Sequence, residues 1–488
     1  MAADNDDLTL VLDIGKSHAK LLMFDAAGAV VEQHGRANRS VTASLGYTAL
    51  GVSELAQWMT EVLSGSRLTA HCTHAIASTH GAAFVALGDD DDAPAWEPVD
   101  YEFDDGNAAL RSAYQSERDE FAATLAPDLP AGLNAARQLH WMQHTHPGAW
   151  ARTRCLLPYP QYWGWWLSGV AASEVSSLGC HTQLWRPREQ RFSDIATRHG
   201  WAELFAPLAP AWQVLGPVRS ARSRATGLPA SCLVHVGAHD SNACLARMLH
   251  DGGRMTLVST GTWIVVMAPG ASASVLDPQR DMLANVSVRG ELVPTARFMG
   301  GRELEALCAG ASPALASAAG LAELLRDDVH ALPCFAPQGG PFAGSAGVVL
   351  KRGTPIDVAT ALSPVQRASL AALYCAQLTA HLLDRIDAPL PAVIEGPFAE
   401  NDLYLQVLTA LLPPGSVQVS TDPVEGTARG SWLLAHWDRP ADMLPGPKPI
   451  ARSVLPELPR HHRRWLGLLQ QLDSNNASAA VRRGFGRP

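Results

Sequence analysis

The chain has 488 residues, of which 47% are hydrophobic and 17% charged, and its formal net charge at pH 7 is −9. This length favours two domains over a single core, and the negative charge argues against nucleic-acid binding as the main function. The eight cysteines are scattered without a C-x-x-C pair, which argues against a zinc knuckle or a disulfide framework and fits a reducing compartment.

The first residues give no targeting signal. Residues 1–7 are mostly small and acidic, not basic and then apolar, so we expect no signal peptide. The chain also has no uninterrupted apolar run of membrane-spanning length. The sequence therefore predicts a cytoplasmic protein that does not associate with membranes.

Three short apolar runs follow. Residues 8–12, 21–24 and 29–33 have the composition of β-strands, and tight turns separate them. Consecutive strands joined by tight turns predict a β-meander. A nicotinamide-dependent dehydrogenase would instead need G-x-G-x-x-G between its first strand and a helix, and we find none.

The turn after the first strand carries residues suited to a metal ion and a phosphate. Asp13 stands at the strand end, where its carboxylate can hold a hydrated Mg²⁺. Gly15 lets the backbone approach a phosphate closely, while Lys16, Ser17 and Lys20 add charge and a hydroxyl. The alternative is a simple hairpin with a solvated aspartate.

Polar residues farther along the chain are candidates for binding a sugar. His80 and Gly81 end a predicted strand, and His80 either meets a sugar hydroxyl or is a structural histidine. Asp100 and Tyr101 could line a substrate cleft, and so could the small, polar segment that begins at Glu174.

Two other polar segments receive structural interpretations. The four aspartates at residues 89–92 predict a solvated loop in preference to a divalent-metal site. His140, His144 and His146 are close in sequence, but no acidic residue accompanies them at a recognised metal spacing. We therefore assign these histidines to a helix surface and a helix end.

The most informative stretch covers residues 236–243. An apolar run ends in Gly237, His239 and Asp240, and the small residues after them predict the start of a helix. A carboxylate at this point is well placed to accept a proton from an alcohol. Asp240 is also, together with Asp13, a candidate metal ligand.

A second glycine-containing turn follows another apolar run. It is rich in hydroxyl and backbone N–H groups, as phosphate oxygens require, and consists of Ser259, Thr260, Gly261 and Thr262. Gly300 and Gly301 stand at the start of a helical pattern whose N-terminus could face phosphates. Residues 303–330 are rich in Ala and Leu and predict a helix, as do residues 365–383.

A third glycine turn lies near the end of the chain. A predicted strand at residues 392–395 leads into Gly396, Pro397 and Asn401 and then into a helix at residues 403–411, a notch suited to adenine or ribose. A further helix begins near residue 425. The tail at residues 471–488 predicts disorder.

Together these motifs resemble those of the FGGY family of carbohydrate kinases, within the actin-like ATPase superfamily. Residues 13–20, in the pattern Asp-x-Gly-x-Ser-x-x-Lys, look like the family's first phosphate loop, and residues 259–263 look like its second. Residues 396–401 look like its adenosine motif, and Asp240 occupies the position of its catalytic base. The matches run in the family's order from near residue 8 to near residue 436.

The resemblance implies an α/β fold of two ribonuclease-H-like (actin-like ATPase) domains with a cleft between them, at residues 1–245 and 246–470. It also implies ATP and Mg²⁺ as cofactors, and hinge closure that excludes water. In role terms, Asp240 would accept the proton of the sugar hydroxyl, and Asp13 would orient the metal. The turn at residues 260–262 would hold the γ-phosphate, and Gly396 and Asn401 would border the adenosine.

Two departures from the family pattern bear on the substrates. Pro397 stands where the adenosine motif usually repeats glycine, which leaves the nucleotide preference open. His239 before Asp240 resembles the rhamnulokinase and fuculokinase branches more than the glycerol or xylulose ones. An imidazole there can hydrogen-bond a ketose oxygen, so we expect an L-rhamnulose- or L-fuculose-like sugar or a related ketose such as xylulose or ribulose.

The alternatives are a non-catalytic member of the superfamily and a phosphohydrolase. The first would lack an alcohol activator, and the second would offer water in place of a sugar pocket. Asp240 and the polar segments around His80, Asp100 and Glu174 favour the sugar kinase. The expected partners are a small-molecule ketose and ATP, with no nucleic acid and no membrane, and a homodimer is left open.

Overall fold

The chain folds into two compact units. The computed structural model describes residues 7–90, 93–250, 252, 254–336, 339–422, 424–439 and 445–484. The N-terminal unit comprises residues 1–253, 283–293 and 422–444, and the C-terminal unit comprises residues 254–282, 294–421 and 445–488. The sequence predicts two continuous domains with a boundary near residue 245. In the structure, residues 283–293 and 422–444 also belong to the N-terminal unit.

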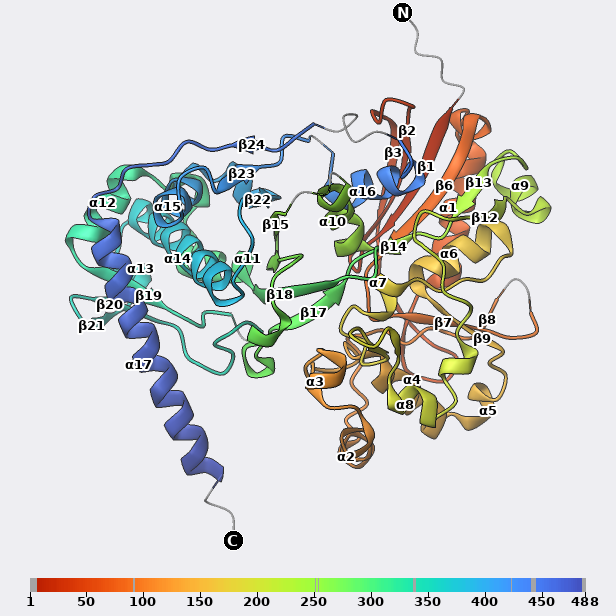
Figure 1. Ribbon diagram of the computed structural model, residues 1–488, viewed down its shortest axis with the longest axis horizontal. Helices are drawn as coiled ribbons and strands as arrows, with labels where there is room; N and C mark the ends of the chain where they lie inside the picture. The colour runs from red at the N-terminus through yellow and green to blue at the C-terminus, as the bar shows by residue number, and fades with distance from the viewer. Residues whose placement is uncertain are drawn as a thin grey trace, which may run out of the picture. The chain divides into compact units, whose positions relative to one another are not determined.

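The N-terminal unit is built on a mixed sheet in the order β12-β13-β6-β1-β2-β3 (Figure 1). β1 runs antiparallel to β2 and β2 to β3, which forms the predicted meander, and β1 pairs in parallel with β6. β13 and the two-residue β14 both pair in parallel with β6. The strands are β1 (Leu8–Ile14), β2 (His18–Phe24), β3 (Val30–Ala37), β6 (Cys72–Thr79), β12 (Val214–Pro217), β13 (Leu233–His235) and β14 (Ala238–His239).

Burial explains the order of these strands. Every residue of β1 is buried, as expected for a central strand covered on both faces. β3 alternates between half-buried and exposed residues, as expected at an edge. The principal helices of the unit are α1 (Val52–Gly65), α2 (Ala108–Glu117), α4 (Ala135–Thr145), α6 (Tyr159–Ser168), α9 (Ser220–Thr226), α10 (Asp240–His250) and α16 (Gly426–Ala435).

Helix α16 belongs to the N-terminal unit although it lies late in the sequence. It packs against α10, β1 and β6. A Cβ atom added at Gly430 would lie 1.8 Å from the carbonyl oxygen of Ala243 on α10, so only glycine allows the two helices to approach this closely. The small residues of α16 therefore let the segment at residues 422–444 pack in the N-terminal unit.

The smaller elements of the N-terminal unit pack around an apolar cluster that includes Tyr47, Trp141 and Trp201. The smaller elements of this unit are β4 (Ser40–Thr42), β5 (Thr48–Leu50), β7 (Phe84–Leu87), β8 (Pro94–Trp96), α3 (Phe121–Thr124), α5 (Pro147–Trp150), β9 (Cys155–Pro158), α7 (Val175–Leu178), β10 (Trp185–Arg186), β11 (Arg191–Phe192), α8 (Asp194–Arg198) and β17 (Leu283–Val286).

The C-terminal unit repeats the topology of the first sheet. β18, β16 and β15 form an antiparallel meander, and β15 pairs in parallel with β22, which pairs in parallel with β23. The strands are β15 (Thr256–Thr260), β16 (Ile264–Met267), β18 (Leu292–Phe298), β22 (Ala392–Glu395), β23 (Val417–Val419) and β24 (Lys448–Pro449). Two units of this topology make the mixed α/β fold of actin-like ATPases, as the sequence predicts.

Helices pack together in the C-terminal unit, with α14 in contact with α11, α12 and α15. α14 begins at a capping box in which Ser363 and Gln366 satisfy each other's backbone N–H groups. The other elements of this unit are α11 (Gly300–Cys308), α12 (Ala318–Arg326), β19 (Val329–Leu332), β20 (Val348–Lys351), β21 (Thr354–Ile356), α13 (Val358–Ala361), α14 (Pro364–Arg385), α15 (Asp402–Leu411) and α17 (Leu458–Gly484).

Two predicted segments differ from the structure. The helix predicted at residues 303–330 is divided into α11 and α12, because Ala309 and Gly310 adopt left-handed backbone conformations that end α11. The tail predicted to be disordered from residue 471 continues α17 as far as Gly484. Residues 485–488, and residues 91–92 of the predicted aspartate loop, lie outside the described residues.

Two further features of the structure concern the cysteines and the apolar character of the helices. No disulfide joins any of the eight cysteines, all of which are among the described residues, and seven of them are buried. Among the described residues, none of the helices has both the length and the apolar character required to cross a bilayer.

Candidate active site

Asp13 stands at the end of β1 among other charged groups. Its side chain is buried, and Lys20 is its cross-strand partner on β2. Burial and, after it, the charge of Glu425 raise the pKa of Asp13 to about 7, Lys20 opposes this shift, and Asp240 adds to it. Three carboxylates and one lysine thus share a single electrostatic neighbourhood, which is a place where a divalent cation relieves repulsion.

Glu425 is a part of this group that the sequence does not reveal. It lies just before α16 and forms an ion pair with Lys20, the lysine predicted to contact phosphate. The turn between β1 and β2 is tight, because the Gly15 N–H donates to the His18 carbonyl oxygen at 2.9 Å. Ser17 is exposed on this turn, with its Oγ 3.1 Å from His18 Nδ1.

Lys16, which the sequence predicts to contact a phosphate, pairs with carboxylates in the structure. Its ammonium group forms an ion pair with the buried Asp100 and lies 3.3 Å from Glu102. Asp100 also accepts hydrogen bonds from the Ser40 hydroxyl and, at 2.9 Å, from the Glu102 backbone N–H. The Tyr101 ring centroid lies 5.1 Å from Lys16 Nζ. In this structure Lys16 is therefore paired with a buried aspartate, and its contact with a phosphate stays a prediction.

His80 is buried directly after β6. Its ring packs against Tyr101 and Tyr159, with centroid separations of 5.3 and 5.2 Å. Its Nδ1 lies 2.9 Å from the Gly81 carbonyl oxygen, while its Nε2 is buried and has no hydrogen-bond partner among the described residues. Burial lowers the pKa of His80, so the ring is neutral at pH 7. An unpaired buried nitrogen of this kind is suited to a bound polar ligand.

Gly81 makes room for His239. A Cβ atom at this position would lie 2.8 Å from His239 Nε2 and 2.7 Å from the sulfur of Cys180. Gly81 therefore lets the segment that carries His80 approach the one that carries His239, and this steric role is what the structure assigns to it.

Asp240 begins α10 immediately after β14. Its Oδ1 accepts the Ser241 backbone N–H at 2.5 Å and lies 3.1 Å from His239 Nε2. The Asn242 amide nitrogen lies 3.0 Å from His239 Nδ1 and donates to it, so the proton of the neutral ring is on Nε2, facing Asp240. Burial lowers the pKa of His239 and keeps it neutral.

The second carboxylate oxygen of Asp240 has a different environment. Among the described residues no donor bonds to Oδ2, and 30% of the side chain is exposed. One oxygen is thus held by the protein, while the other is available to a substrate hydroxyl. This is the arrangement that a general base requires.

Glu174, which the sequence predicts to line a sugar cleft, caps a helix in the structure. Its side chain is completely buried and caps α7, accepting hydrogen bonds from the backbone and hydroxyl groups of Ser176 and Ser177. Burial raises the pKa of Glu174 to about 7, and these hydrogen bonds oppose the shift. The Ser176 hydroxyl also accepts the His239 backbone N–H at 3.4 Å, so Glu174 is linked through Ser176 to the strand that leads into Asp240.

The C-terminal unit brings the second phosphate turn and the adenosine motif together. The Thr260 hydroxyl donates to the Glu395 carbonyl at 2.5 Å and accepts the Phe398 N–H at 3.1 Å. At Gly396, φ is +86° and an added Cβ would lie 2.0 Å from the Thr260 carbonyl oxygen. The hydroxyl of Thr260 is therefore occupied by the protein, whereas Ser259, Gly261 and the exposed Thr262 remain accessible for a phosphate.

The remaining predicted nucleotide residues also have structural roles. Gly301 packs on the same turn, since an added Cβ would lie 2.5 Å from the Gly261 carbonyl oxygen, and Gly300 faces Ile264. Asn401 caps α15 by accepting the Tyr404 N–H at 3.0 Å. Pro397 is exposed directly after Gly396.

The raised pKa of Asp13 predicts a pH-dependent stability. Its ordinary pKa of 3.8 applies to the unfolded chain, so between pH 3.8 and about 7 only the folded state keeps the proton. The stabilisation is complete below the lower value and is lost as pH rises through the upper one. In metal-free buffer the parent should lose about 3 kcal/mol of unfolding free energy from this group between pH 5 and 8, and Asp13→Asn should lack that decrease.

Urea unfolding at the two pH values measures this difference. Glu61→Gln, at an exposed position of α1, is the matched control and should keep the parental decrease. An Asp13→Asn protein with the full parental decrease would show that Asp13 is not the group that titrates.

Comparison with known proteins places both units in one family. Residues 8–246 match "FGGY family of carbohydrate kinases, N-terminal domain", and residues 252–442 match "Carbohydrate kinase FGGY, C-terminal domain". The chain is similar to the crystal structure of a carbohydrate kinase from Novosphingobium aromaticivorans, with 34% identity and a TM-score of 0.83, over 95% of this chain and 98% of that one.

More distant structures share the fold. A xylulose kinase from Rhodospirillum rubrum has 17% identity and a TM-score of 0.74, over 96% of this chain and 99% of that chain. A Plasmodium falciparum glycerol kinase, determined with ADP, has 9% identity and a TM-score of 0.74, over 99% of each chain.

Proposed function

Because the chain belongs to the FGGY family of carbohydrate kinases, we propose that it transfers the γ-phosphoryl group of Mg·ATP to a hydroxyl of a ketose sugar. In this proposal Asp240 is the general base, the N-terminal unit binds the sugar and the metal, and the C-terminal unit binds the nucleotide.

The observation that carries the proposal is the environment of Asp240. Its Oδ1 is held by the Ser241 N–H and faces the Nε2–H of His239, which fixes the plane of the carboxylate. Its Oδ2, which the described residues leave without a donor, takes the proton of the sugar hydroxyl as the oxygen attacks phosphorus. His239 stays neutral because it is buried, so it holds the carboxylate without competing as an acid.

The residues around Asp13 fit a magnesium ion. A buried carboxylate whose pKa is raised towards 7 by its burial and by two neighbouring carboxylates is costly to ionise unless a cation compensates. Asp13 would hold the ion, with Asp240 near enough to share its field, and Mg²⁺ supplies charge neutralisation for the phosphates. Lys20 and Glu425 complete the charge balance of this site.

The nucleotide is assigned to the two turns joined through Thr260. In this proposal the backbone N–H groups of residues 259–262 bind phosphate, while Gly396, Pro397 and Asn401 border the adenosine. Because the hydroxyl of Thr260 is already bonded within the protein, its contribution is to hold the two turns together.

A ketose fits the polar groups of the N-terminal unit. His80 offers the buried Nε2 that lacks a partner, and Tyr101 and the ion-paired Asp100 lie beside it. His239 next to the base supports an L-deoxyketose such as L-rhamnulose or L-fuculose as the first candidate. The names of the solved relatives add xylulose, gluconate and glycerol to the compounds worth testing.

An assay of ADP release across these compounds tests the proposal. With Mg·ATP, we expect one ketose to raise the rate by at least about a thousandfold over ATP alone, since closure on the sugar suppresses hydrolysis. Chelation of Mg²⁺ should abolish the activity, and re-addition should restore it. ADP release that is equal with and without every sugar would contradict the proposal and indicate a phosphohydrolase.

A further inference from the structure

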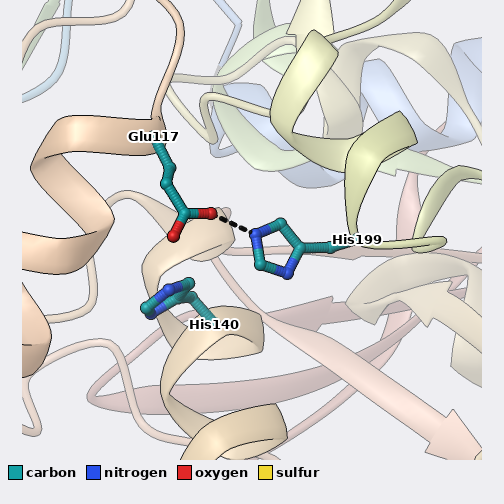
Figure 2. Close-up of side chains that lie close together, drawn as sticks. All are labelled: Glu117, His140 and His199. Carbon is teal, nitrogen blue, oxygen red and sulfur yellow. Dashed lines mark hydrogen bonds and ion pairs between the residues drawn. The ribbon is translucent and has the colours of Figure 1, made fainter.

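Three side chains that are distant in sequence, none of them assigned to the reaction, meet in the N-terminal unit. Glu117 is the last residue of α2, His140 lies on α4, and His199 directly follows α8. One potential ligand atom from each lies within 4.8 Å of the other two. Figure 2 shows the Glu117 carboxylate above the His140 ring and beside the His199 ring, to which a dashed line joins it. The sequence associates no acidic residue with His140, and the fold supplies one.

The contacts of His199 determine which of its nitrogens faces Glu117. The indole N–H of Trp201 donates to Gln143 Oε1 at 2.8 Å, which identifies that atom as an acceptor. His199 Nδ1 lies 3.2 Å from the same oxygen and therefore carries a proton. His199 Nε2 is left facing Glu117 Oε2 at 2.6 Å. A ring whose Nδ1–H is held by an amide oxygen has the orientation and tautomer of a metal ligand that binds through Nε2.

His140 supplies a second, independent observation. Its ring is 1% exposed, and its Nε2 is buried without a hydrogen-bond partner among the described residues. Buried polar atoms are nearly always bonded, so this nitrogen calls for a ligand. The ring centroid lies 5.5 Å from that of His199.

We propose that Glu117, His140 and His199 bind a divalent transition-metal ion of the zinc class. Two imidazoles and one carboxylate are a donor set that Zn²⁺ accepts, with water as the fourth ligand, whereas Mg²⁺ prefers oxygen donors only. The site is therefore chemically distinct from the magnesium site assigned to Asp13. Glu117 and His199 are 35% and 13% exposed, which gives an ion access from solvent.

Binding requires only a small rearrangement. A tetrahedral ion with bonds of about 2.1 Å holds its ligand atoms roughly 3.4 Å apart. His140 must therefore approach by about an ångström, and the proton between His199 and Glu117 must be replaced by the ion, which moves that pair slightly apart. The bound ion would link three helices that are separate in sequence: α2, α4 and the end of α8.

Zinc titration of the chelator-treated, full-length protein tests the site. In the presence of excess Mg²⁺, competition with a chromophoric chelator should give one equivalent of tightly bound Zn²⁺ per chain, together with a rise in melting temperature beyond the one that Mg²⁺ alone gives through the Asp13 site. Co²⁺ should give the visible absorption of a tetrahedral site. His140→Gln and Glu117→Gln should each weaken the affinity by about ten- to a hundredfold or more.

His146→Gln is the matched control, because this histidine follows the same helix but packs against Tyr47 and Trp141. It should retain parental zinc affinity. Since His140 is buried, Glu117→Gln at a half-exposed position keeps the test decisive if His140→Gln fails to fold. Absence of zinc binding, or equal affinity in the parent and Glu117→Gln, would overturn the proposal.

Discussion

Asp240→Asn is expected to lower kcat by about a thousandfold while leaving the fold and the binding of both substrates nearly unchanged. The amide is isosteric with the carboxylate and can still place its oxygen toward the Ser241 N–H and the Nε2–H of His239. Its nitrogen then takes the place of Oδ2 and offers a donor where the hydroxyl needs an acceptor. Steady-state kinetics with saturating sugar and Mg·ATP measure the loss, and KM should change by less than about threefold.

The control for this variant is Glu61→Gln, which removes an exposed carboxylate of the same unit without touching the reaction. It should be as active as the parent. An Asp240→Asn enzyme that keeps more than about a tenth of the parental kcat would remove Asp240 from the role of base.

Gly237→Ala is expected to destabilise the protein by more than about 3 kcal/mol or to prevent its folding. Gly237 has φ +80°, and an added Cβ would lie 2.1 Å from the backbone oxygen of Ala77 on β6. The backbone cannot move away without breaking the pairing of β14 with β6, which positions His239 and Asp240. Urea unfolding, or the yield of folded protein, measures the effect.

Gly46→Ala separates the steric clash from the backbone strain. Gly46 has φ +87°, close to that of Gly237, but an added Cβ would meet nothing within 4 Å. Gly46→Ala should therefore lower the unfolding free energy by only about 1–2 kcal/mol, which is the strain of an alanine in the left-handed conformation. Equal losses in the two variants would show that the approach to Ala77 has no special importance.

The parts of the fold that local sequence determines were predicted correctly. The meander follows from three apolar runs and two turns, and it forms as β1, β2 and β3. The strand, glycine turn and helix around Gly396 form as β22 and α15. In both segments, apolar runs and turn residues within about twenty positions carry the whole signal.

The roles of individual polar side chains could not be predicted in the same way, because they depend on distant partners. In the sequence Lys16 resembles a phosphate ligand, but its ion-pair partner Asp100 is distant in sequence and comes close only in the folded chain. Glu174 is polar in sequence, yet it is buried by the helix start that it caps. Glu425 gives no signal of its own, since only the packing of α16 brings it to Lys20.

The cluster of Glu117, His140 and His199 could not be predicted from the sequence for the same reason. His144 and His146, the neighbours of His140, drew attention to spacing along one helix, whereas the side chains that complete the cluster come from α2 and from the residue after α8. Spacing rules detect ligands on one element, and they miss sites assembled from three.

Phosphorus NMR of the products formed from Mg·ATP and the preferred ketose distinguishes phosphoryl transfer from hydrolysis. We expect the γ-phosphoryl group to appear in a sugar phosphate monoester, in an amount equal to the ADP formed, with no accumulation of inorganic phosphate. Inorganic phosphate in an amount equal to the ADP, with the sugar unchanged, would contradict this expectation.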